Sequence, residues 1–163
     1  MQAVLAAGIA VIGTLLGSTV AYLFQRRQAR FVHSMASHGR MRDEQILAFS
    51  SFAEAIADLR GAQIRRWTSR QEDQPDSEQY VHARAESWRL RTAARSAMYR
   101  VQLVAADEAL ANRAGELVEL TVAILAAGDV QDLDASAKRS ATETNMFITE
   151  ARRVLRSDRA QLI

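Results

Sequence analysis

The chain has 163 residues, enough for one small domain, and it contains no cysteine. The absence of cysteine excludes a disulfide-stabilised fold and any metal site built on thiolates. The formal net charge is +2, but residues 26–42 carry five arginines and no acid, whereas residues 43–163 carry 16 basic and 19 acidic groups. That acidic balance argues against nucleic acid as the main partner of the larger part.

The chain begins with an apolar segment. The first charged side chain is Arg26, and residues 3–24 are apolar apart from a few hydroxyls. Twenty-two helical residues rise about 33 Å, enough to cross a hydrocarbon layer of roughly 30 Å. We therefore expect residues 1–25 to form an uncleaved transmembrane helix. The alternatives are a cleaved signal peptide, which normally has basic residues before its apolar run, and a buried helix of a soluble protein, which usually has a polar side.

A strip of arginines follows the apolar segment. Positive residues next to a membrane helix stay in the cytoplasm, so we expect a single-pass protein of the bacterial cell membrane with its N-terminus outside and its C-terminal domain in the cytoplasm. Each basic group near an anionic leaflet contributes about 1 kcal/mol of attraction. The residues expected to contact anionic lipid are Arg26, Arg27, Arg30, Arg40 and Arg42.

Small residues recur every four positions within the apolar segment, at Gly13, Gly17 and Ala21. Small side chains at this spacing allow two helix backbones to approach closely in a membrane. We expect this stripe to mediate self-association. The alternative interpretation is that glycine and alanine are simply common in membrane helices.

After the basic juxtamembrane segment 26–42, the rest of the chain reads as one helical domain, residues 43–163. Apolar residues recur at three- and four-residue steps from Ile46 to Trp67, which predicts an amphipathic helix of about 28 residues that opens at Asp43. A polar turn with the only proline follows. Asp76 or Ser77 is expected to cap a second helix over about 78–105.

Two further helices complete the expected domain. Asp107 suits an N-cap for a third helix, and Gly128 is in the C′ position expected where that helix stops. Asp132 or Asp134 is expected to open the fourth. No segment has the alternation of a strand. The predicted fold is all-α, with an N-terminal transmembrane helix followed by an antiparallel four-helix bundle of long helices.

No motif in the chain predicts catalysis. Its three histidines, His33, His38 and His82, lack the spacing of a metal site. There is no glycine-rich phosphate loop and no nucleophile elbow in the soluble part. We therefore expect no enzyme, no cofactor and no metal.

The predicted second helix has side chains of interest on two faces. Arg84, Arg91 and Arg95 form a row on one face, and this row is suited to grip phosphate, to pair with the acids of the third helix, or to remain solvated. Trp88 falls on the apolar stripe, as Trp67 does in the first helix, and both tryptophans are expected in the core.

Several stretches resemble a known group. The segment Gly8 to Ser18 followed by Phe24-Gln25-Arg26-Arg27, the segment from Arg100 to Leu110, and the segment from Phe147 to Leu155 are similar to small single-pass membrane proteins of Streptomyces-type actinobacteria, some of them labelled KilB-like after plasmid proteins connected with intramycelial spread. This resemblance implies a role at the membrane in DNA transfer between hyphal compartments, beside a translocase. Its motifs are not catalytic and carry over no functional residue.

The leading functional interpretation is a membrane-anchored helical scaffold or interaction protein. The lipid bilayer, a second copy of the chain and a protein at the membrane are the expected partners, because one bundle of about 120 residues buries limited apolar area. The alternatives are a membrane-tethered accessory protein that contacts nucleic acid during conjugative transfer, and a holin-like pore-forming protein.

Overall fold

The computed structural model describes residues 40–71 and 77–160. The expected membrane segment, its small-residue stripe and the arginines at positions 26, 27 and 30 lie outside these ranges. Within the described ranges, no helix combines the length and the apolar character needed to traverse a bilayer. From Arg42 onward the described residues form one compact unit, whereas Arg40 and Met41 belong to another.

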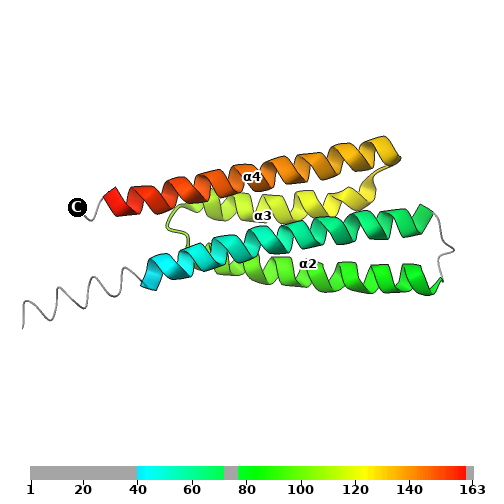
Figure 1. Cartoon of the computed structure of the whole chain (residues 1–163), viewed down its shortest axis with the longest axis horizontal. Coiled ribbons are helices and arrows are strands. Elements are labelled where there is room, and N and C mark those ends of the chain that lie inside the picture. The colour runs from blue at the N-terminus through cyan, green and yellow to red at the C-terminus, as the bar shows by residue number, and fades with distance from the viewer. Residues whose placement is uncertain (1–39, 72–76, 161–163) are drawn as a thin grey trace, which may run out of the picture. The chain divides into compact units, whose positions relative to one another are not determined.

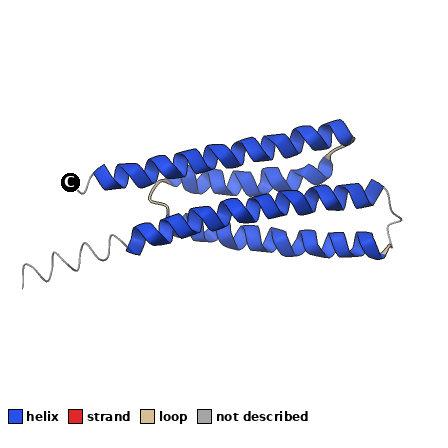
Figure 2. Ribbon diagram, viewed as in Figure 1, coloured by secondary structure: helices blue, strands red, loops and turns tan. Residues whose placement is uncertain are grey.

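The all-α prediction is confirmed for the described residues, which contain helices and turns and no strand (Figure 2). The first helix occupies residues 40–71. It is followed by α2 (Glu78–Val104), by α3 (Glu108–Val122) with a 3₁₀ turn, η1 (Ala123–Ala126), and by α4 (Val130–Ala160).

Two predicted helix starts are confirmed by their capping bonds. The Ser77 hydroxyl accepts a hydrogen bond from the Tyr80 backbone N–H at 3.1 Å. The Asp107 carboxylate accepts from the N–H groups of Ala109 at 2.8 Å and Leu110 at 3.3 Å. Each cap satisfies backbone donors that the first helical turn leaves without a partner.

The boundary between α3 and α4 differs from the prediction. The α-helical part of α3 ends at Val122, and the chain tightens into η1 before Ala127 turns it to an extended conformation. No glycine among the described residues has a positive φ, so Gly128 is not a left-handed C′ residue. The cap of α4 is Asp129, whose carboxylate accepts from the Asp132 N–H at 2.8 Å, and neither Asp132 nor Asp134 has that role. The helix therefore begins earlier than its first buried residue, Leu133, suggests.

The helices of the 42–163 unit lie side by side in alternating directions (Figure 1). In the 40–71 helix and α2, Gln45 bonds to the Val104 carbonyl and Gln63 bonds to Ser87. Residues later in the first helix therefore meet residues earlier in α2, as in an antiparallel pair. The pair formed by α3 and α4 follows the same rule, because Arg113 reaches Glu150 and Thr121 reaches Ser140. An antiparallel bundle results, as short connections between neighbouring helices require.

Aromatic rings fill the larger part of the core. Phe147 of α4 is fully buried and meets Phe49 and Phe52 edge-on, with ring centroids 6.1 Å and 5.0 Å apart. Leu59, Val101, Leu117 and other buried aliphatic residues complete this cluster. A second, smaller cluster surrounds Trp67, which is 5% exposed, and this confirms the prediction that Trp67 belongs to the core.

A layer of buried polar side chains separates the two clusters. Each helix contributes one member: Gln63, Ser87, Thr121 and Ser140. The Ser87 hydroxyl donates to the Gln63 side-chain oxygen at 2.7 Å, and the hydroxyls of Thr121 and Ser140 are 2.8 Å apart. Buried polar groups are tolerated only when they have partners, so this layer favours the register in which Ser87 meets Gln63 and Thr121 meets Ser140.

Candidate partner-binding surface

One face of α2 carries aromatic and arginine side chains. Steps of four, three, four and four residues place them in a single row along the helix. We call this row the aromatic–arginine stripe, and its members are Arg84, Trp88, Arg91, Arg95 and Tyr99. Trp88 and Tyr99 are 53% and 56% exposed, respectively. The three arginines singled out from the sequence belong to this face, and their contact with phosphate or a partner stays a prediction.

The prediction that Trp88 belongs to the core is wrong. Ser87, which the periodicity allows equally well, takes the inward position and is 2% exposed. Its small side chain fits beside the buried Gln63, to which it donates a hydrogen bond. The indole of Trp88 is consequently turned about 100° around the helix axis, onto the surface next to the arginines.

The Arg91 guanidinium lies over the Trp88 ring, with its carbon 5.6 Å from the ring centroid. A cation in this position is attracted to the face of the ring by about 0.5–1 kcal/mol. The Arg91 Nε is buried and has no hydrogen-bond partner in the structure. Arg91 therefore covers the face of the stripe's tryptophan, and its Nε remains a hydrogen-bond donor without a partner.

The stripe borders α3, where its neighbour is acidic. Arg95 donates to Glu119 at 3.1 Å, so one of the three arginines pairs with the third helix. Glu108 and Glu116 are also exposed on α3. Arg113 of α3 instead pairs with two acids of α4, Glu143 at 3.4 Å and Glu150 at 3.1 Å.

The arginines expected to contact lipid are only partly described. Arg40 is exposed and Arg42 is half-buried, both at the start of the 40–71 helix. Their contact with lipid stays a prediction.

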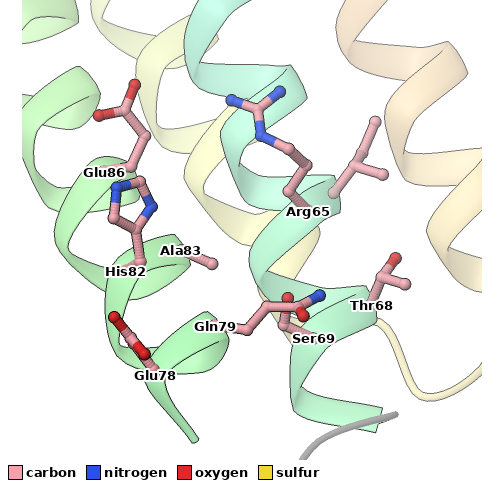
Figure 3. Close-up of a pocket in the computed structure, with 9 residues that line it drawn as sticks. Arg65, Thr68, Ser69, Glu78, Gln79, His82, Ala83 and Glu86 are labelled. Carbon is pink, nitrogen blue, oxygen red and sulfur yellow. The ribbon is translucent and has the colours of Figure 1, made fainter.

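A polar groove lies between the end of the 40–71 helix and the start of α2 (Figure 3). It encloses about 900 Å³, and Arg65, Ser69, Glu78 and His82 are among its lining residues. Within the described ranges, no set of three or more acidic or histidine side chains is arranged to hold a metal ion.

Glu86, at the edge of the same groove, is held in an ion pair along α2. Its carboxylate accepts from Arg89 at 2.7 Å and 2.9 Å. This hydrogen bonding lowers the pKa of Glu86 below its ordinary value, and the positive charge of Arg89 adds to the effect. The pair stabilises the surface of the helix, since Glu86 and Arg89 belong to one helix face.

These features define a class of protein: a four-helix bundle whose exposed aromatic and arginine side chains suit contact with another macromolecule. The sequence profile of the KilB plasmid transfer protein family matches residues 46–155, about two thirds of the chain. The chain belongs to this family, which confirms the resemblance seen in its sequence and a role related to plasmid transfer. No curated protein and no solved structure matches it.

Proposed function

We propose that this protein is a membrane-anchored, non-enzymatic scaffold of plasmid transfer that self-associates through the aromatic–arginine stripe. The carrying observation is the stripe itself, because a complete bundle exposes Trp88 and Tyr99 among arginines. Tryptophan, tyrosine and arginine are the residues that contribute most to binding at protein interfaces.

A second copy of the chain fits the stripe by charge. Three acids are exposed on α3, namely Glu108, Glu116 and Glu119, and Glu119 pairs with Arg95 of α2. In a two-fold dimer, the stripe of each copy would rest on α3 of the other. Such pairing sets positive against negative surface and covers Trp88 of each copy. Charge complementarity of this kind fixes the register of a complex.

The membrane anchor in this proposal is the uncharged segment 3–24, which has the length and composition of a spanning helix. The arginines of segment 26–42 would hold the inner leaflet and keep the bundle in the cytoplasm. A row of bundles concentrated on one membrane face would then offer a platform to the DNA-transfer machinery.

Photocrosslinking tests the stripe. A benzoylphenylalanine at position 88 of the full chain, in cells that carry out plasmid transfer, should give an adduct containing two differently tagged copies. The same probe at exposed Ser96, on another face of α2, is the matched control. Equal adducts at both positions, or none at position 88, would refute self-association through the stripe.

Membrane anchoring has a separate test. The full chain should stay in the membrane pellet after alkaline extraction, and a C-terminal tag should be protected from protease added outside spheroplasts. Release of the intact chain into the supernatant, or digestion of the tag, would refute this part of the proposal.

A contact with nucleic acid is the second candidate, because a tryptophan next to three arginines also suits base stacking and phosphate binding. The pairing of Arg95 with Glu119 and the acids of α3 count against it. Three phosphate contacts predict a slope of about −2 for log affinity against log salt with single-stranded DNA. That slope, and its loss in Arg84→Gln/Arg91→Gln, would favour this candidate.

A further inference from the structure

A narrow apolar groove runs between the 40–71 helix and α4, away from the aromatic–arginine stripe. It encloses about 330 Å³, and its floor includes Phe49, Phe147 and Leu155. Ile46, 44% exposed, stands at its rim. The polar side chains at the groove are only two, Ser50 and Arg152.

We propose that this groove, which we call the Phe49–Phe147 groove, binds one acyl chain of an anionic membrane lipid, with the lipid phosphate on Arg152. Its size is at the small end of ligand pockets, which hold compact apolar molecules with a few polar groups that fix orientation. Arg152 is exposed, and its position on α4 puts a single cation at the edge of an apolar trough. A hydrocarbon chain with an anionic head has the matching distribution of charge.

A second copy of the chain fits this groove less well. A stable dimer buries about 800 Å² on each partner. The large apolar residues of the groove other than Ile46 are buried or half-buried, so they offer far less surface than that. A single acyl chain needs only a narrow apolar trough.

The location of the groove also favours a lipid. It lies near the beginning of the 40–71 helix and the end of α4, and the sequence joins this beginning to segment 3–24 through only 15 residues, 25–39. If segment 3–24 spans the bilayer, as the proposed function holds, those residues keep the near end of the groove within about 60 Å of the lipid even when fully extended, because Ile46 lies six helical residues beyond position 40. The local concentration of lipid at the groove is then high.

The absence of native cysteine makes the test direct, since one introduced cysteine carries one label. Ser50→Cys places a fluorophore at the groove. Ser96→Cys is the matched control, because Ser96 is also exposed and lies about one helical turn from the level of Ser50. The full chain in mild detergent micelles is titrated with phosphatidylglycerol that carries a nitroxide quencher on its acyl chain.

We expect saturable quenching of the label at position 50, several-fold stronger than at position 96. Arg152→Gln should weaken the apparent affinity about fivefold, as expected for one basic group, whereas Arg153→Gln, an equal charge change on the next residue, should leave it unchanged. Ala53→Leu, which adds volume at the groove wall, should abolish the saturable part. Circular dichroism of each variant checks that the bundle is folded.

Three results would overturn the proposal. Equal quenching at positions 50 and 96 would mean that the label reports only the micelle. Equal losses in Arg152→Gln and Arg153→Gln would mean unspecific attraction. Equal affinity for phosphatidylcholine would remove the anionic class. Because quenching is measured in micelles, its outcome is independent of alkaline extraction and protease protection, which test the anchor.

Discussion

The buried hydrogen bond between Ser87 and Gln63 offers the sharpest test of how the bundle is held in register. Both side chains are at most 2% exposed, and the bond is 2.7 Å long. Ser87→Ala leaves the Gln63 side-chain oxygen buried without a donor, which should cost about 1–3 kcal/mol in the free energy of unfolding. The other polar atom of this side chain, the Gln63 amide nitrogen, is a donor to the Val122 carbonyl at 3.5 Å, so it does not replace the bond lost by the oxygen.

Removing the glutamine side of this bond should cost less stability than removing the serine side. In Gln63→Leu, the Ser87 hydroxyl can turn to a backbone carbonyl one helical turn earlier, so we expect a loss of about 1 kcal/mol. The double variant replaces both polar groups by apolar ones and should be more stable than the sum of the single losses predicts, by about 1–2 kcal/mol.

Urea unfolding of the full chain in mild detergent, followed by far-ultraviolet circular dichroism, measures these free energies. Ser96→Ala, at an exposed position of the same helix, is the control for the change in helix propensity. The reasoning fails if Ser87→Ala is no more destabilising than this control, or if the losses of the two single variants add without coupling. A changed dependence on urea would show that the variants alter more than one bond.

Three further predictions concern the core, a cap and a surface pair. Phe147→Ala should cost about 3–5 kcal/mol by thermal or urea unfolding, because the ring is fully buried, whereas exposed Met146→Ala should change little; similar losses would contradict the packing. Asp107→Ala should cost about 1 kcal/mol, because it frees two backbone donors at the start of α3, and Asp107→Asn should retain most of that stability. The side chain of Glu86 should titrate below its ordinary pKa when followed by NMR. Its contribution to stability is therefore present above the unfolded-state pKa and is lost as the pH falls through the folded-state pKa. Arg89→Gln should return the pKa toward normal, and an unchanged pKa would refute the ion pair.

Local signals in the sequence predicted the helices well and their ends unevenly. Ser77 and Asp107 were recognisable as caps because a cap acts on backbone groups two or three residues away. The end of α3 was not, because Gly128 resembles a C-terminal signal while the chain turns at Ala127 without a positive φ. There the indole N–H of Trp67 donates to the Ala127 carbonyl at 2.9 Å, a contact 60 residues apart in the chain.

The candidate surface was half visible from the sequence. The period of the helix places Arg84, Arg91 and Arg95 on one face in any helical structure. Trp88 was missed, although its spacing of four from Arg84 and three from Arg91 is a signal for the same face. Hydrophobicity favoured the core for it, and the hydrogen bond of Ser87 to Gln63 decided the phase. The Phe49–Phe147 groove had no signal, because its walls come from opposite ends of the domain.

By itself the sequence determined the helical class, the positions of the helices and the concentration of arginine after an uncharged segment, because helix period, capping and charge are properties of neighbouring residues. Only the tertiary structure decided which of two adjacent residues turned inward, where α3 stopped and where a groove remained open. Each of these depends on the fit between side chains far apart in the chain, and a close-packed interior allows one solution among several that the sequence pattern permits.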